Sequence, residues 1–268
     1  MEIGLVTDAL VDHDFDSLLK TCTELRLQQL EFSCGNYTSG KFFQVDRMLE
    51  DQKHRDERIS KIKDYNFKIS AISCHGNPLA PGEYGKAHDG VIRKTIKLAS
   101  ILKLDKVILL SGCAAGPGDI NPNWIVSCWP PEKLKILEWQ WNEVLIPYWK
   151  DVSTYAEGLG VKLCFELHGG DMVYNAPTTH RVRDQVSKNI GANLDPSHVM
   201  WMGGDPIQMA KDLDEALFYV HIKDTTINHS KAGLNTLMET TWFADVEKRS
   251  WNFSTPGHGH DETWWSQF

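Results

Sequence analysis

Short apolar runs that alternate with longer helical patterns constrain this chain more than any other feature of its sequence. Seven runs of strand length are visible, and segments with helical periodicity separate most of them. The runs end at about residues 7, 33, 75, 111, 166, 195 and 223. Such alternation is typical of parallel strands joined by crossover helices, so we expect an α/β fold.

The pattern changes after the seventh run. We expect a long loop from about Thr225 to Gly259 and then the start of a seventh helix at about Asp261. Earlier helical stretches cover 45–66, which is strongly charged, and 132–160, which Pro147 is expected to break. No boundary divides the chain, so residues 1–268 are predicted to form one domain.

Two folds are compatible with parallel strands, an open doubly wound sheet and a closed barrel. An open nucleotide-binding sheet usually carries a Gly-rich motif after its first strand or a GxxxxGK[ST] loop, and this sequence has neither. Polar residues end nearly every predicted strand, which is where TIM barrels hold their functional groups. We therefore predict a (β/α)8 TIM barrel.

Three ionisable residues end successive predicted strands. Glu166, Asp195 and His221 are separated by 29 and 26 residues, close to the ~31 residues of one β/α unit of a barrel. Their side chains should therefore meet at one mouth. Two carboxylates and an imidazole suit Mn²⁺, Mg²⁺, Co²⁺ or Zn²⁺. A lone histidine or glutamate at a strand end is usually an ordinary core residue, but three in register favour a metal site.

A second group of ionisable residues is expected above this metal site. Side chains two apart on a strand share a face, so His168 should accompany Glu166 and Lys223 should accompany His221. His168 is our leading candidate for the catalytic base, with Glu166 or His198 as alternatives. Lys223 is a further acid/base candidate, although a lysine at a solvated pocket edge would look the same.

Four further residues are predicted to contact a substrate. His75 and Asn77 follow the third predicted strand in "SCHGNP", where they could bind sugar hydroxyls. Trp129 and Trp201 belong to the ten tryptophans of the chain, several of which stand in predicted loops and could stack on a sugar ring. Core filling is the commoner role for any single tryptophan.

Composition excludes several classes of partner. The net charge of −8 argues against a nucleic-acid binder, and no apolar stretch approaches the ~18 residues of a membrane span. The six cysteines show no CxxC spacing, which indicates reduced thiols. The N-terminal stretch "MEIGLVTD" enters a strand without a preceding basic segment, so no signal peptide is visible. We therefore expect a cytoplasmic protein that acts on a small molecule.

At these residues the sequence resembles a known family, the xylose isomerase-like TIM barrels, and within it the sugar phosphate isomerase/epimerase group. The motifs that carry the resemblance are "SCHGNPL", "NWIVSCWPPE", "FELHGGDMVYN", "NLDPSHVMW", "YVHIKDT" and "RSWNFSTPGHGHD". The resemblance implies a divalent cation, Mn²⁺ first, bound by Glu166, Asp195, His221 and a second glutamate on an eighth strand. The Asp-x-x-His of the epimerases corresponds to Asp195 and His198.

No eighth strand is visible before Phe268, so we expect a barrel that lacks this strand and the fourth ligand. The resemblance implies an isomerase or epimerase that removes a proton alpha to the carbonyl of a sugar. It also fits the metal-binding α subunit of a C-glycoside deglycosidase, which works with a small β subunit and cleaves 3-keto-glycosides by β-elimination. A third alternative is a catalytically inactive barrel that serves as a binding or scaffold subunit, and a homo-oligomer is compatible with all three.

Overall fold

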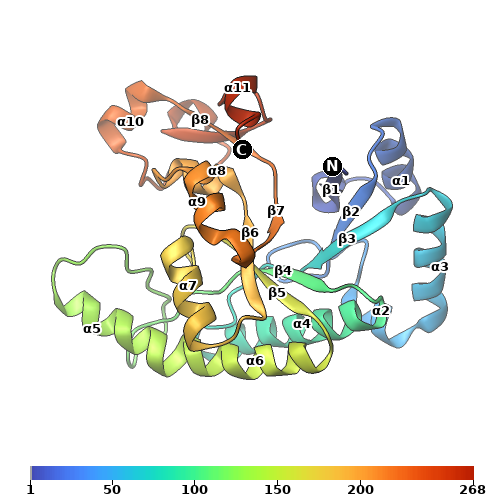
Figure 1. Cartoon of the computed structure of the whole chain (residues 1–268), viewed down its shortest axis with the longest axis horizontal. Helices are drawn as coiled ribbons and strands as arrows, with labels where there is room; N and C mark the ends of the chain where they lie inside the picture. The colour runs from blue at the N-terminus through green and yellow to red at the C-terminus, as the bar shows by residue number, and fades with distance from the viewer. Residues whose placement is uncertain (1) are drawn as a thin grey trace.

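The computed structural model describes residues 2–268 and contains a parallel sheet of seven strands in the order β1 to β7. The strands are β1 (Gly4–Val6), β2 (Gln29–Ser33), β3 (Lys68–Ser73), β4 (Lys106–Leu109), β5 (Lys162–Glu166), β6 (Ile190–Leu194) and β7 (Leu217–Val220). Each strand pairs in parallel with its neighbour in sequence. The sheet curves from β1 round to β7, as Figure 1 shows.

Helices α1 to α9 connect the seven strands, and most of them cover the outer face of the sheet, whereas α10 and α11 come after β7 and lie above it (Figure 1). They are α1 (Phe15–Glu24), α2 (Val45–Glu50), α3 (Gln52–Asp64), α4 (Gly82–Ile101), α5 (Glu132–Trp139), α6 (Ile146–Gly158), α7 (Ala176–Gln185), α8 (Pro196–Trp201), α9 (Pro206–Leu213), α10 (His229–Asn235) and α11 (Glu262–Trp265). Within residues 2–268, no further strand pairs with the outer edges of β1 and β7. The predicted fold, a TIM-type barrel without its eighth strand, is thus confirmed.

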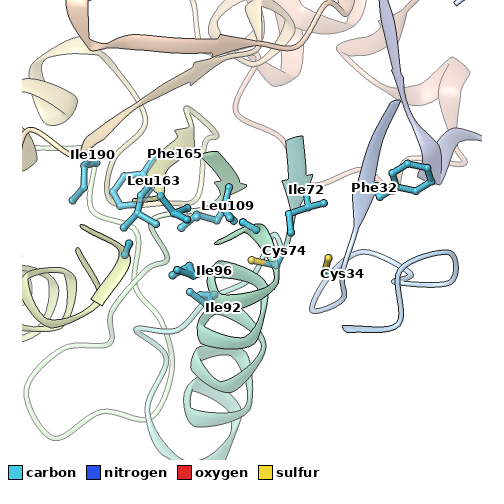
Figure 2. Packing of buried hydrophobic residues seen from close by; sticks show 14 of the residues in the cluster. Phe32, Cys34, Ile72, Cys74, Ile92, Ile96, Leu109, Leu163, Phe165 and Ile190 are labelled. Carbon is cyan, nitrogen blue, oxygen red and sulfur yellow. The ribbon is translucent and has the colours of Figure 1, made fainter. Parts of the chain in front are cut away.

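The core lies between the sheet and its helices. Leu109 and Leu163 on the strands are fully buried, as are Ile92 and Ile96 on α4, and Figure 2 shows these side chains packed together. Burying one such side chain contributes roughly 1.5–3 kcal/mol to stability. This packing holds the strands in fixed register, so the residues that end them have fixed positions relative to one another.

Two helical predictions need correction. The charged stretch 45–66 forms two helices, because Asp51 has an extended conformation and its side chain accepts a hydrogen bond from the His54 N–H as the cap of α3. The stretch 132–160 is not broken at Pro147; it stays helical through a π-helical turn, Gln140–Leu145. Pro147 directly follows this π-helical turn, in the first turn of α6.

The predicted loop from Thr225 to Gly259 is also wrong in part. It contains an antiparallel hairpin, in which β8 (Asp224–Ile227) pairs with β9 (Trp251–Ser254), and the helix α10 lies between them. The hairpin stands above the carboxyl ends of β6 and β7 in Figure 1. The expected helix after residue 261 is confirmed as α11, whose cap is Asp261.

One buried carboxylate ties the C-terminal segment to the hairpin. Asp224 is fully buried, and its Oδ2 accepts hydrogen bonds from the backbone N–H groups of Gly257, Gly259 and His260 and from the indole of Trp265. Burial opposes ionisation, but these bonds and one from the His260 ring lower the pKa of Asp224 to about 2. A side chain at Gly259 would meet the Thr225 carbonyl oxygen at 2.2 Å, so this close approach requires glycine.

Candidate active site

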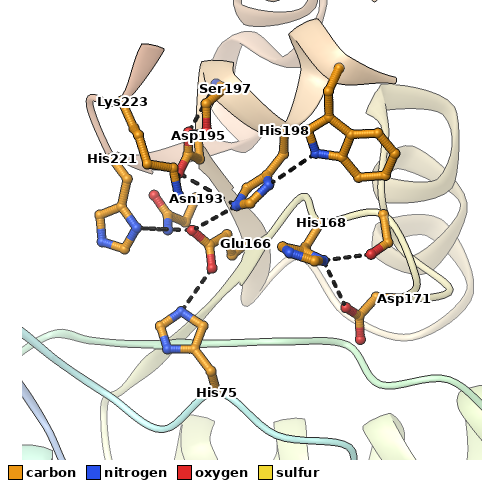
Figure 3. Close-up of polar contacts among 12 residues, drawn as sticks. His75, Glu166, His168, Asp171, Asn193, Asp195, Ser197, His198, His221 and Lys223 are labelled. Carbon is orange, nitrogen blue, oxygen red and sulfur yellow. Dashed lines mark hydrogen bonds and ion pairs between the residues drawn. The ribbon is translucent and has the colours of Figure 1, made fainter. Parts of the chain in front are cut away.

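The carboxyl ends of β5, β6 and β7 bring three predicted site residues together. Glu166 is the last residue of β5, Asp195 follows β6, and His221 follows β7. Glu166 and Asp195 are 7% and 1% exposed, so their charges are shielded from water. Figure 3 shows these side chains converging on one volume inside the mouth of the barrel.

One set of possible metal donors is already compact. Ligand atoms of Glu166, Asp195 and His198 all lie within 4.8 Å of one another, and all three residues are buried. His221, which we predicted as the third ligand, joins this set through Glu166, because its Nδ1 lies 3.1 Å from Glu166 Oε1. The structure therefore brings two histidines to the predicted pair of carboxylates, and the assignment of ligands stays a prediction.

His198 is held by the indole of Trp201. Trp201 Nε1 lies 3.4 Å from His198 Nδ1, while His198 Nε2 lies 3.5 Å from Asp195 Oδ2 and 3.8 Å from Glu166 Oε1. Because an indole N–H can only donate, it assigns Nδ1 as the acceptor and Nε2 as the nitrogen that carries the proton. Burial, and then the proximity of His168, hold the pKa of His198 well below its usual range.

His221 is held by two carboxylates. Its Nε2 lies 2.8 Å from Oε2 of Glu31, a residue of β2 that is 2% exposed, and its Nδ1 faces Glu166. Burial favours neutral imidazole, but the charges of Glu31 and Glu166 raise the pKa of His221 well above its ordinary value. We did not predict Glu31 as a site residue, because no spacing rule links a residue of the second strand to one of the seventh.

Burial and neighbouring charges shift the pKa values of the two carboxylates, Asp195 and Glu166. Burial raises the pKa of Asp195, and the nearby charge of Glu166 adds to this effect, while Lys223 opposes it. The pKa of Glu166 is well below its usual range despite burial, because His75 and His221 stabilise its charge. Two adjacent buried carboxylates with imidazoles around them are the chemistry of a divalent-cation site, so the residues present fit such an ion.

His168, the leading candidate base, stands at the open side of the site. Its ring centroid lies 4.1 Å from that of His198, and 39% of its side chain is exposed. The remaining sides are surrounded by protein, and this desolvation lowers the pKa of His168. The histidine is therefore neutral near pH 7, which is the state a general base needs.

Asp171 lies beside His168 and was missed in the sequence. Its Oδ2 is 3.9 Å from His168 Nδ1, and the residue is 7% exposed. Burial raises the pKa of Asp171 to about 8, with a contribution from the charge of Glu166. The spacing of three residues after His168 in "HGGD" is the signal that could have indicated it.

Lys223 closes the site from the hairpin side. Its Nζ lies 2.9 Å from Asp195 Oδ2 and 4.2 Å from the ring centroid of Phe253 on β9. The Phe253 ring also meets His198 edge-on, with centroids 5.3 Å apart. The hairpin, which we expected to be a loop, thus supplies an aromatic wall to the site.

The four predicted substrate contacts have different surroundings. His75 Nε2 lies 3.0 Å from Glu166 Oε2, so His75 belongs to the cluster in Figure 3. Asn77 uses its side chain internally, since Oδ1 accepts hydrogen bonds from the N–H groups of Leu79 and Cys113 and Nδ2 donates to the Cys113 carbonyl oxygen. This bonding favours a structural role for Asn77.

The two tryptophans differ as well. Trp201 is 8% exposed and stacks on Trp251 of β9, with ring centroids 4.9 Å apart. Trp129 is 75% exposed and lies in the loop between β4 and α5. Trp201 thus positions His198 and the hairpin, while a contact of either tryptophan with substrate stays a prediction.

The length and polarity of the helices bear on whether they could span a membrane. Within residues 2–268, the helices are too short or too polar for any of them to cross a membrane.

Comparison with known proteins shows which family this chain belongs to. YfiH of Bacillus subtilis (strain 168), described as an uncharacterized protein, is 39% identical over 272 residues, which cover 100% of this chain and 87% of the relative. The IolI protein with a binding zinc atom has a similar structure, with a TM-score of 0.59 and 18% identity over 84% of this chain and 74% of that one.

The apo form of 3-keto-D-glucoside 4-epimerase, YcjR, from E. coli is similar too, with a TM-score of 0.55 and 13% identity over 79% of this chain and 73% of that one. At these identities the two structures show a shared fold. Residues 34–268 match the family described as xylose isomerase-like TIM barrel. Since that match spans most of the sequence, the chain belongs to the xylose isomerase-like TIM barrel family.

Proposed function

We propose that this protein is a divalent-metal-dependent enzyme that removes the proton alpha to the carbonyl of a sugar or keto-sugar, as isomerases and epimerases do. The observation that carries the proposal is the convergence of Glu166, Asp195 and His198 within 4.8 Å, with the ring of His168 beside them. Two buried carboxylates suit a hard cation, and a neutral histidine next to them suits proton transfer.

The residues divide into two roles in this proposal. Glu166, Asp195 and His221 would hold the cation, with Mn²⁺ as the first candidate and Mg²⁺, Co²⁺ or Zn²⁺ as others. When bound, it would stabilise the negative charge that develops on the carbonyl oxygen. The related IolI structure, with its binding zinc atom, supports a divalent ion in this fold.

Proton transfer is assigned to the chain's own side chains. His168, neutral because burial lowers its pKa, accepts the alpha proton through the side of the ring that is open to the site. In an isomerase or epimerase, a proton then returns to the neighbouring carbon or to the other face. Lys223 and His198, which both lie beside Asp195, are the candidates that deliver it.

A keto-glycoside is a second candidate substrate, and the hairpin favours it. Phe243, which is 55% exposed, stacks on Phe253 with ring centroids 6.1 Å apart, and Phe253 in turn contacts His198. These rings form an apolar surface that leads outward from the site and suits an aglycone. Loss of the alpha proton followed by departure of the aglycone would be a β-elimination, and the similarity to 3-keto-D-glucoside 4-epimerase supports a keto-glycoside.

Metal analysis is the first test of this proposal. Purified protein should contain or bind about one equivalent of a divalent ion, and Glu166→Gln should weaken Mn²⁺ binding at least ~10-fold because an anionic ligand becomes neutral. The Mn²⁺-loaded protein is then assayed with ketohexoses and 3-keto-glucosides, with epimer and released aglycone measured separately. Metal binding without turnover of either class would favour an inactive scaffold subunit.

A further inference from the structure

Glu31 is a buried acidic residue to which the proposed function gives no role. It lies on β2, whereas its partner His221 follows β7, so the contact spans the interior of the barrel past the intervening β1. Glu31 Oε2 lies 2.8 Å from His221 Nε2, and Glu31 is 2% exposed. Burying a carboxylate is costly, which indicates that this contact has a purpose beyond packing.

The two nitrogens of the His221 ring face different groups. Nε2 faces Glu31, while Nδ1 faces Glu166 Oε1 at 3.1 Å and the Asn193 amide nitrogen at 2.9 Å. An ionised carboxylate can only accept hydrogen bonds, so Glu31 requires the proton on Nε2. When the second proton of His221 leaves, as binding to a cation requires, the lone pair is on Nδ1, the nitrogen that faces the proposed cation site.

We propose that Glu31 is a positioning residue that fixes the ring orientation and tautomer of His221, so that Nδ1 is presented to a divalent cation beside Glu166 and Asp195. This inference rests on the proposed function, because it concerns the same cation. Histidines that bind metals usually donate their other N–H to a carboxylate or carbonyl, and loss of that partner typically weakens metal binding 10- to 100-fold.

His198 provides an internal contrast. Its Nδ1 accepts from the Trp201 indole, which assigns the proton of the neutral ring to Nε2, the nitrogen that faces Asp195. In that tautomer, the nitrogen nearest the carboxylates has no lone pair to offer. Of the two histidines beside Glu166, the hydrogen-bond partners thus prepare His221 for a cation and His198 for hydrogen bonding.

Glu31 is not itself placed as a ligand to the same ion. The His221 ring stands between it and Glu166, because the two carboxylates contact opposite nitrogens of that ring. Glu31 Oε1 is buried and has no hydrogen-bond partner among residues 2–268. Among these residues, the hydrogen bond that the Glu31 carboxylate makes is therefore the one from Oε2 to His221.

The test compares Glu31→Ala and Glu31→Gln with a matched control, Thr7→Val. Thr7 is fully buried and its hydroxyl donates to the Glu31 backbone carbonyl oxygen at 3.0 Å, so the control disturbs the same site without touching the carboxylate. Mn²⁺ affinity is measured by titration with detection of free Mn²⁺. We expect Glu31→Ala to weaken binding ~10- to 100-fold, Glu31→Gln to weaken it less because its amide oxygen still accepts, and Thr7→Val to bind as the wild type does.

A second readout does not depend on metal. In metal-free protein labelled with ¹⁵N-histidine, His221 should show a slowly exchanging Nε2–H, identified by its absence in His221→Gln. This signal should survive in Thr7→Val and be lost in Glu31→Ala. Unchanged Mn²⁺ affinity in both Glu31 variants, or an unchanged Nε2–H in Glu31→Ala, would overturn the inference. If the wild type binds no Mn²⁺ at all, the proposed function fails, and the labelling experiment still decides the role of Glu31.

Discussion

Lys223 Nζ lies 2.9 Å from Asp195 Oδ2, so a lysine contacts the same carboxylate that we assign to a divalent cation. Two positive groups cannot share one carboxylate without mutual repulsion. Either the lysine swings toward substrate when the cation binds, or the cation binds against the repulsion of the ammonium group. Both cases make the affinity for metal sensitive to the charge of Lys223.

We therefore predict that Lys223→Met increases Mn²⁺ affinity. Removal of a positive charge a few ångströms from a divalent ion should tighten binding by ~10-fold or more, even with strong dielectric screening. Turnover should fall at the same time if Lys223 transfers a proton. Calorimetric titration with Mn²⁺ checks the first effect, and a weaker affinity in Lys223→Met would show that the ammonium supports the site rather than competing for it.

Asp171 predicts a pH dependence of stability. Its pKa is raised to about 8 in the folded protein, whereas an exposed aspartate in the unfolded chain titrates near 3.9. The folded state therefore keeps this proton over a range where the unfolded state has lost it. The contribution of Asp171 to the free energy of unfolding is fully present below about pH 4. It falls as the pH rises to 8, by at most ~1.4 kcal/mol per pH unit.

Asp171→Asn should remove that slope, because an amide does not titrate. Urea unfolding of wild type and variant at pH 5, 6, 7 and 8 should show the variant gaining stability relative to the wild type as the pH rises. Asp184→Asn, an exposed residue whose carboxylate pairs with Lys188, is the control and should show no such trend. Parallel curves for wild type and Asp171→Asn would contradict the raised pKa.

For Asp224, we expect stability to change with pH in the opposite direction. Its pKa is lowered to about 2, so its contribution is present above the unfolded pKa of about 3.9 and is lost as pH falls toward 2. Asp224→Asn loses the charge that accepts four hydrogen bonds at Oδ2, and we expect a loss of roughly 2–3 kcal/mol at pH 6.

The difference between wild type and Asp224→Asn should shrink as the pH falls from 4 toward 2, because the unfolded wild-type chain then binds a proton that the folded carboxylate, with its pKa of about 2, does not bind. Chymotrypsin should also cleave the variant faster at Trp264 and Trp265, because the segment that Asp224 anchors is released. Chemical unfolding at pH 6, 4 and 3 measures the first effect. A difference that stays constant over this range would mean that size and shape at position 224, not its charge, stabilise the segment.

Much of this site could be predicted because strand ends are readable in a sequence. Apolar runs that stop at Glu166, Asp195 and His221 place these residues at one edge of a parallel sheet, and the structure brings them together. Their spacing matches the length of a β/α unit, which determines that they come from neighbouring strands. Local periodicity was sufficient for these positions.

Contacts across the barrel and within short elements could not be predicted in the same way. Glu31 meets His221 only because the sheet curves, and curvature leaves no local pattern. The strands of the hairpin have four residues each and are separated by 23 residues, so neither alternation nor a tight-turn motif marks them. The position of Phe253 depends on such contacts and was missed for that reason, whereas Asp171 was missed although it stands only three residues after His168.

The most direct test of the central claim is solvent exchange at the alpha carbon. Mn²⁺-loaded protein is incubated with a keto-sugar or 3-keto-glucoside in deuterated water, and deuterium in recovered substrate and product is measured by NMR and mass spectrometry. The wild type should incorporate deuterium alpha to the carbonyl, and His168→Ala should lower the rate ~10²- to 10⁴-fold with nearly unchanged Mn²⁺ affinity. His180→Ala, a histidine paired with Asp212 outside the site, should exchange at the wild-type rate. Exchange at the wild-type rate in His168→Ala, or none in the metal-loaded wild type with any of these substrates, would contradict the account.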